Sequence, residues 1–278
     1  MKYFMKKLIF GWLLFSMLFG NEKFWDSHSA HILPKKRWEI GIFQPFRYGY
    51  SENLEYSIYP LWSIVMPNIS LKKKHDSSNG YLTASRWRFI YPTPLLNAVA
   101  RKGIGGLIDP SFIMPPMLGI SGSWMMTRYH RKTDITINFG LDLAINFGKL
   151  DQRSSIDLPL IYHRLGVFYN GWGIHSGLDM QKQLIGVIKL LVDIDLKILP
   201  GIHSGSVKTN LSKILGNYAI EHKMLFIYQK SDSFRILTGY KLVHGQYPFG
   251  IETRLLPFLP LLEKWVPMIE LQWANSGK

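Results

Sequence analysis

The chain has 278 residues and no cysteine. Without a thiol it can form no disulfide framework, no thiolate metal site and no cysteine nucleophile. It also lacks any long uninterrupted apolar run after residue 20, although 47% of its residues are hydrophobic. A helix that spans a membrane needs about 20 consecutive apolar residues. The hydrophobic residues must therefore serve shorter or alternating segments.

Acidic residues are scarce relative to basic ones, 19 against 33, so the formal net charge is +14. Loss of Lys2, Lys6 and Lys7 with an exported leader would lower this charge by three, to +11. A basic chain attracts anionic partners, such as anionic solutes or the phosphates of outer-leaflet lipid. Nucleic acid is a poor partner for an exported chain.

The chain begins with a basic segment, an apolar run from Leu8 to Phe19 and a small residue, Gly20. This order is typical of a secretory signal peptide over residues 1–20, with an uncleaved anchor as the alternative. We interpret the polar residues 21–36 as a periplasmic lead-in. His28 and His31 stand near Asp26 there, but no fourth ligand is evident, so the sequence predicts neither a metal site nor a cofactor.

Residues 135–147 alternate without a break between large apolar and small or polar side chains. The apolar set is Ile135, Ile137, Phe139, Leu141, Leu143, Ile145 and Phe147. A period of two predicts a β-strand with one apolar face. The run exceeds the roughly 5–6 residues of a usual strand and suffices for the roughly 9–11 that cross a bilayer. Taken alone, it also fits a long strand of a soluble sandwich.

The same alternation recurs along the chain. We predict further strands at 38–42, 54–58, 64–72, 81–91, 118–127, 165–170, 172–181, 189–198, 218–228, 234–242, 249–256 and 265–273, of which 64–72 and 249–256 are the least regular. In lipid every backbone polar group must be paired within the protein, which permits only helices or a closed barrel. We therefore predict an all-β fold, an antiparallel transmembrane β-barrel of about 12 strands, within a range of 10 to 14.

Three segments interrupt this pattern. Thr93 and Pro94 are typical of a helix start and predict one short helix over 94–102. Residues 47–51 are expected to form a turn, and residues 72–80 a polar loop that ends in the hairpin dipeptide Asn79-Gly80. The barrel is expected to occupy residues 37–273, followed by a tail over 274–278.

Aromatic residues recur near the ends of the predicted strands, as interfacial girdles would require. They are Trp38, Trp62, Tyr91, Trp124, Tyr129, Tyr169, Trp172, Tyr218, Tyr228, Trp265 and Trp273. With its signal peptide, long amphipathic strands and aromatic C-terminal strand, the chain resembles the bacterial outer-membrane β-barrel proteins. The resemblance implies an outer-membrane location, contact with outer-membrane lipid and lipopolysaccharide, and assembly by the barrel-assembly machinery.

If the large apolar residues face lipid, the opposite register lines the lumen. The expected lumen residues are Asn138, Asp142, Asn146, Arg164, His175, Asp179, Lys189, Asp193, Asp195, Lys197, Arg235, Lys241 and Glu270. Charges of both signs would set ion selectivity in an open pore, whereas in a narrow barrel they would pair into a packed polar interior. The sequence leaves both states open.

One motif raises an enzymatic alternative. Residues 75–80, His-Asp-Ser-Ser-Asn-Gly, resemble the His-x-Ser-Asn-Gly stretch of outer-membrane phospholipase A, which implies His75 as base and Ser77 as nucleophile. One serine is inserted relative to that pattern, and a polar loop explains the same residues. Elsewhere, the adjacent His175 and Ser176 would point to opposite faces of a strand and cannot form a dyad directly.

We therefore predict a porin-like conduit for small solutes, including anionic ones, and no catalytic residue. A lipid hydrolase and a closed structural or binding barrel are the alternatives. The solute and the oligomeric state do not follow from the sequence.

Overall fold

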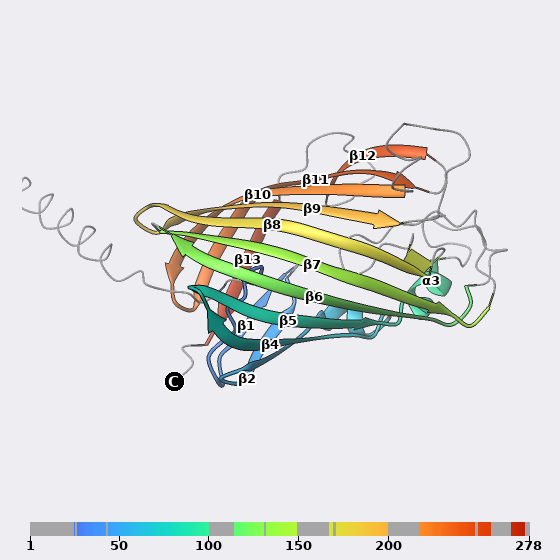
Figure 1. The fold of residues 1–278 in the computed structure, drawn as a ribbon, viewed down its shortest axis with the longest axis horizontal. Helices are drawn as coiled ribbons and strands as arrows, with labels where there is room; N and C mark the ends of the chain where they lie inside the picture. The colour runs from blue at the N-terminus through green and yellow to red at the C-terminus, as the bar shows by residue number, and fades with distance from the viewer. Residues whose placement is uncertain are drawn as a thin grey trace, which may run out of the picture.

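The computed structural model shows an antiparallel β-barrel (Figure 1). The structure describes residues 25, 27–42, 44–99, 114–130, 132–148, 167–168, 171–199, 217–247, 250–256 and 268–275. The expected signal peptide lies outside these residues. Within them the prediction of an all-β fold is confirmed: twelve strands close into a barrel, accompanied by two short helices.

Each strand pairs with the next in the chain from β1 to β11, and all pairs are antiparallel. The strands are β1 (Trp38–Gly41), β2 (Phe46–Ser51), β3 (Leu54–Ile58), β4 (Asn68–Ser78), β5 (Tyr81–Ile90), β6 (Met117–His130), β7 (Thr133–Asn146), β8 (Trp172–Ile185), β9 (Ile188–Leu199), β10 (Asn217–Ser231), β11 (Phe234–Tyr247), β12 (Gly250–Leu256) and β13 (Met268–Ala274). Because β13 pairs with both β11 and β1, the sheet closes on itself.

Two strands share the twelfth place in the ring. β13 pairs with residues 234–239 of β11, and β12 pairs with residues 241–247 of the same strand. β12 and β13 therefore follow one another along β11. The irregular segment predicted at 249–256 is β12, and only β13 links β11 to β1.

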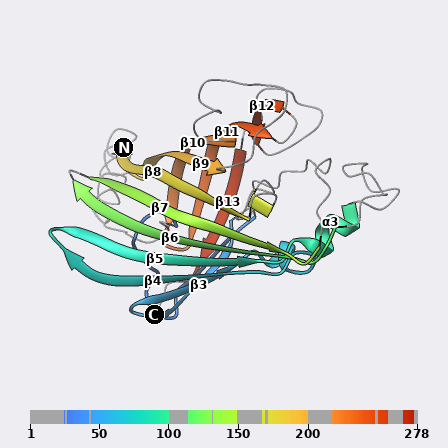
Figure 2. The same cartoon turned by 45° about the vertical axis from the view of Figure 1, so that its right-hand side comes forward.

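The two ends of the barrel differ. Five hairpins, from β2–β3 to β10–β11, turn through two residues each at one end, which we call the turn end. At β4–β5 these residues are Asn79 and Gly80, both with positive φ as a tight hairpin turn requires. The connections that carry α2 (Pro60–Ser63) and α3 (Thr93–Val99) begin at the opposite ends of β3 and β5, which we call the loop end, and α3 lies there in Figure 2.

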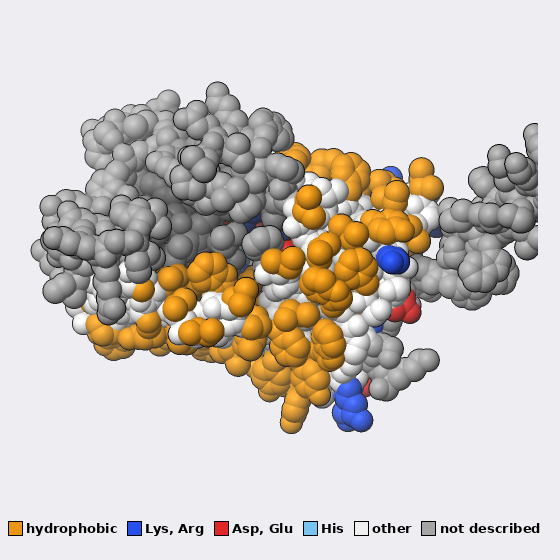
Figure 3. Space-filling view, turned by 180° about the vertical axis from the view of Figure 1, so that it is seen from behind, with side chains coloured by type: hydrophobic (Ala, Val, Ile, Leu, Met, Phe, Trp, Pro, Cys, Tyr) orange, Lys and Arg blue, Asp and Glu red, His pale blue; other side chains and the backbone are white. Residues whose placement is uncertain are grey.

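The wall is apolar outside and polar inside. The seven large apolar residues of the 135–147 run are 40–66% exposed, whereas the intervening Thr136 and Asp142 are buried. Hydrophobic side chains cover most of the described outer wall in Figure 3. No helix among the described residues is long and apolar enough to cross a membrane.

Several local predictions need correction. β2 occupies the expected turn at 47–51, and β4 continues through most of the expected loop at 72–80. The run of lysines misled this prediction, because Lys72 points inward and is buried, whereas Lys73 is exposed outside. Within the predicted strand 165–170, Val167 and Phe168 are helical. The predicted helix 94–102 is α3, whose described part ends at Val99, and α2 was not predicted.

The pairing of β1 with β13 predicts a specific cross-link. Ile40 and Trp273 are Cα partners, so cysteines at these positions should form a disulfide upon oxidation. The chain has no cysteine of its own, and the oxidised form should migrate differently from the reduced form on a boiled gel. Ile40→Cys with Ile269→Cys is the control, because Ile269 lies four residues along the strand, roughly 13 Å away. Failure of the first pair to cross-link would contradict this closure.

Candidate functional site: the barrel lumen

The N-terminal residues 25–37 lie inside the barrel toward its turn end, and we call them the inner segment. The Ala30 amide donates to Thr127 Oγ1 at 2.7 Å, and the Leu33 amide donates to Glu55 Oε2 at 2.9 Å. Lys72 and Arg86 donate to carbonyl oxygens of the same segment. These contacts come from four different strands, β3 to β6, so the inner segment crosses the interior.

Trp25 anchors the start of the inner segment. Its ring lies between two guanidinium groups, with Arg37 5.3 Å and Arg235 4.8 Å from the ring centroid. Arg235 also donates to the Trp25 carbonyl at 2.9 Å, and the Trp25 amide donates to Glu39 Oε1 at 3.0 Å. Trp25 is 1% exposed.

A buried ion-pair network fixes the other end of the inner segment. Arg47 lies between two carboxylates, with Nη1 2.8 Å from Glu39 Oε2 and Nη2 2.9 Å from Glu55 Oε2. Arg37 Nε donates to Glu39 Oε1 at 3.2 Å. All four side chains are buried, so each charge depends on its partner for the solvation it loses.

The described part of the expected lead-in, residues 25 and 27–36, is therefore part of the barrel interior. Sequence patterning could not reveal this position, because a short polar segment without periodicity fits a linker equally well. The described residues show features of both expected states of the lumen: the inner segment fills part of it toward the turn end, and an unfilled cavity lies beyond that segment.

Beyond the inner segment lies a cavity of about 220 Å³. Eight of the expected lumen residues line it: Asn138, Asp142, His175, Asp179, Asp193, Asp195, Lys197 and Lys241. The cavity is also lined by residues absent from that prediction, among them His28, Arg86, Arg88, Ser121, Ser123, Glu221 and Lys223. Tyr59 lines the cavity from the connection after β3. Burial raises the pKa of its phenol above the ordinary value, and the positive charge of Arg88 opposes part of this rise.

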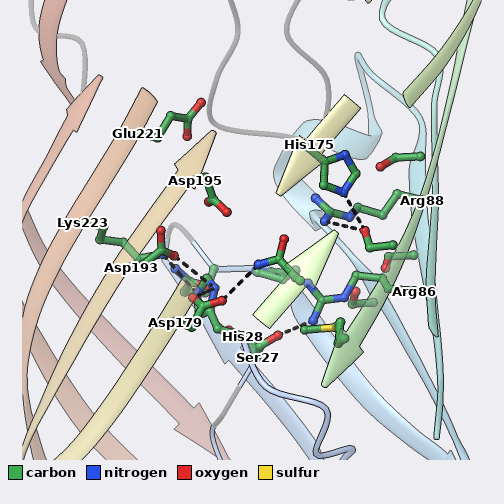
Figure 4. Close-up of a pocket in the computed structure, with 18 of the residues that line it drawn as sticks. Ser27, His28, Arg86, Arg88, His175, Asp179, Asp193, Asp195, Glu221 and Lys223 are labelled. Atoms are coloured by element: carbon green, nitrogen blue, oxygen red, sulfur yellow. Dashed lines mark hydrogen bonds and ion pairs between the residues drawn. The ribbon is translucent and has the colours of Figure 1, made fainter. Parts of the chain in front are cut away.

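Charges of both signs face one another across this cavity. On β9 to β11, Lys223 Nζ lies 2.7 Å from Asp193 Oδ2, and Glu221 is paired with both Lys197 and Lys241. Arg86 and Arg88 project from β5 on the other side (Figure 4). The lumen thus has an acidic and lysine-rich wall opposite an arginine wall.

One group among the described residues could hold a metal ion: His28, Asp179 and Asp193, whose ligand atoms lie within 4.8 Å of one another. His28 Nδ1 is 3.4 Å from Asp179 Oδ1 and 3.5 Å from Asp193 Oδ2. A cation is already adjacent, because Lys223 contacts both Asp193 and His28 Nε2. The sequence placed His28 beside Asp26 and His31, whereas the fold places it beside two carboxylates of the wall.

The remaining expected lumen residues lie elsewhere. Arg235 contacts Trp25, Glu270 is buried near Gln44, and Lys189 is buried near the turn end of β9. Asn146 donates to the carbonyl of Phe168. Arg164 lies outside the described residues.

The structure does not join His75 to Ser77. A β-bulge shifts the register between His75 and Ser78, and His75 Nε2 instead lies 2.9 Å from Ser85 Oγ. The His75 ring stacks on Trp124 with centroids 4.8 Å apart. The side chains of His75, Ser85 and Trp124 all belong to the outward-facing register of the wall.

Comparison with known proteins assigns the chain to no family: no protein-family model matches it, and no curated protein matches it either. What the site can do therefore follows from its geometry. It is a polar cavity lined by charges of both signs.

We expect the buried network at the turn end to contribute strongly to stability. Arg47→Met would leave Glu39 and Glu55 without their shared partner, at a cost of about 3–5 kcal/mol. The urea midpoint, followed by the folded band on unheated gels, should fall accordingly. Arg128→Met on the exposed outer wall is the control and should change little. Equal midpoints for the two variants would contradict the role assigned to Arg47.

Proposed function

We propose that this protein is an integral outer-membrane β-barrel whose polar lumen is a narrow conduit for small charged solutes. The proposal rests on the distribution of side chains, which is the reverse of that in a water-soluble protein: charged groups lie inside and large apolar groups lie outside. A closed barrel that buries Asp142 and Asp193 while exposing a continuous set of isoleucine, leucine and phenylalanine side chains has its apolar face toward its surroundings. Water would oppose this arrangement, and a bilayer would favour it.

The difference between the ends supports the same proposal. Outer-membrane barrels have short periplasmic turns and longer extracellular loops. Here every hairpin at the turn end has two connecting residues, and the start of β1 lies beside the end of β13 at that same end. The turn end, with the inner segment, would then face the periplasm, and the loop end with α2 and α3 would face outward.

The positions of aromatic residues near both ends of the strands support the proposed membrane location. Trp38, Tyr228 and Trp273 lie near the turn end of their strands, and Trp172 and Tyr218 lie near the loop end. Tyr129 also lies near the turn end but belongs to the inward-facing register of β6. Trp124 departs from this pattern, since it stands in the middle of β6. Amphipathic rings at two levels are typical of interfacial girdles.

The lumen suggests a restricted conduit. Its cavity of about 220 Å³ admits only a small solute, and the inner segment narrows the passage toward the turn end. The lining has both signs, so we narrow the expected class from small solutes to small charged solutes of either sign. Such paired rings of charge set selectivity in membrane pores.

A lipid-facing wall predicts a depth-dependent cost of charge. Leu141→Arg, within the central part of β7, should reduce folding stability in lipid vesicles by about 2–4 kcal/mol. Tyr228→Arg, on the outer face near the turn end of β10, should cost about 0–1 kcal/mol. Urea titration of vesicle-folded protein gives both values. Equal tolerance of the two substitutions, with the chain soluble without detergent, would contradict a membrane location.

Conduction predicts discrete current steps from the full mature chain in planar bilayers. The double variant Lys197→Gln, Lys241→Gln should become more cation-selective, because Glu221 would keep its charge without either lysine. The reversal potential in a salt gradient measures this shift. Lys132→Gln, in the exposed β6–β7 turn, is the control. Absence of current steps would reject the conduit in favour of the closed binding barrel.

A further inference from the structure

Three side chains in the lumen form a connected series across adjacent strands: Ser123 on β6, His175 on β8 and Asp142 on β7. Ser123 Oγ lies 3.0 Å from His175 Nε2, and His175 Nδ1 lies 3.2 Å from Asp142 Oδ2. All three are at most 7% exposed, and all three line the central cavity.

The register of the sheet explains how this contact forms. Ser123 and His175 are both Cα partners of the same residue, Gly140, one from each neighbouring strand. A Cβ at Gly140 would lie 2.5 Å from His175 Nε2, so only glycine leaves room for the imidazole to cross β7 and reach Ser123. Asp142 stands two residues further along the same face of β7, where it reaches Nδ1.

The order of atoms matches a nucleophile, a base and an orienting acid. A carboxylate that accepts the Nδ1 proton leaves Nε2 as the acceptor for the serine hydroxyl. This arrangement activates serine in enzymes of unrelated folds and is identified by its geometry. A histidine that merely solvated a lumen would not need a carboxylate on one nitrogen and a serine on the other.

The surroundings of Ser123 suit acyl transfer. Arg88 Nη2 lies 3.5 Å from Ser123 Oγ, so its charge is close to where an oxyanion would develop. Figure 4 shows Arg88 and His175 near one another beside the cavity. Two residues along the same strand, the buried hydroxyl of Ser121 faces the same cavity and has no hydrogen-bond partner among the described residues.

We propose that Ser123, His175 and Asp142 form a catalytic triad that hydrolyses small carboxylic esters inside the lumen. Ser123 Oγ attacks the ester carbonyl carbon while its proton passes to His175 Nε2, and Arg88 stabilises the oxyanion. Collapse breaks the bond to the alcohol, which takes that proton and leaves an acyl-serine. A water molecule then attacks the acyl carbon with His175 as base, which releases the carboxylic acid and restores the serine hydroxyl.

This activity goes beyond passage of solutes and does not depend on conduction. The cavity of about 220 Å³ limits the substrate to short acyl and alcohol groups. The site also differs from His75 and Ser85, which face the outside of the wall, so long-chain lipid is not the expected substrate.

The test uses the full mature chain folded in detergent, with diisopropyl fluorophosphate and p-nitrophenyl acetate as probes. We expect one diisopropylphosphoryl group per chain, formed as Ser123 Oγ displaces fluoride from phosphorus and located on Ser123 by mass spectrometry. Ser123→Ala should abolish this adduct and lower kcat/KM for the ester by at least about 100-fold, and His175→Gln should have a similar effect. Ser85→Ala is the matched control, because Ser85 also contacts a histidine but faces the outside of the wall, and it should keep both the adduct and the rate.

Barrel integrity is followed in every variant by the shift between unheated and boiled gel bands. Asp142→Asn, a nearly isosteric change, should retain that shift but lose at least about 100-fold in rate, which a purely structural network would not require. The proposal is overturned if the folded wild type gains no adduct on Ser123, or if Ser123→Ala and Ser85→Ala hydrolyse the ester equally.

Discussion

A sheet with an apolar outer face cannot leave an edge open, because each unpaired backbone donor or acceptor there would lack a partner. In this chain β13 provides the closing pairing, between β1 and residues 234–239 of β11. That strand brings the two ends of the barrel sequence together, and the ring it completes separates an inside from an outside. The polar lumen, the inner segment and the central cavity all exist because of this closure.

Once closed, the barrel has to compensate the charges it encloses. Arg47 does so at the turn end by bridging Glu39 and Glu55, and Lys223 does so near the centre by pairing with Asp193. The inner segment contributes to the same compensation, since its amides donate to Glu39 and Glu55. Buried pairs of this kind add little net stability over apolar packing but penalise the loss of either partner. They consequently fix one arrangement of the inner segment against the wall.

The two proposed activities of the lumen depend on different residues. Passage of charged solutes depends on the lysines and carboxylates of β9 to β11, whereas ester hydrolysis depends on Ser123, Asp142 and His175 across β6 to β8. A solute that enters the cavity meets both walls, so selectivity and chemistry would be coupled by position. Gly140 shows how closely the second site depends on strand register, since a shift of one residue would turn His175 toward the outer face.

Local patterns in the sequence were enough to establish the class of fold and, for most of the long strands, which face points outward. The run from Ile135 to Phe147 has a period of two, and periodicity is local, so its apolar outer face and its inward Asn138 and Asp142 could be predicted from the sequence alone. The two-residue turn at Asn79-Gly80 was also predictable, although the lysines before it concealed the end of β4. Strand number followed approximately, because β12 and β13 resemble two strands yet share one place in the ring.

Which of these residues meet depends on the tertiary structure. Ser123 and His175 lie 52 positions apart in the chain and contact one another across a third strand. His28 lies near Asp179 and Asp193 because the inner segment turns into the barrel. These contacts depend on the register between strands and on closure of the ring, which are relations between distant segments. A periodic pattern within one segment contains no information about them.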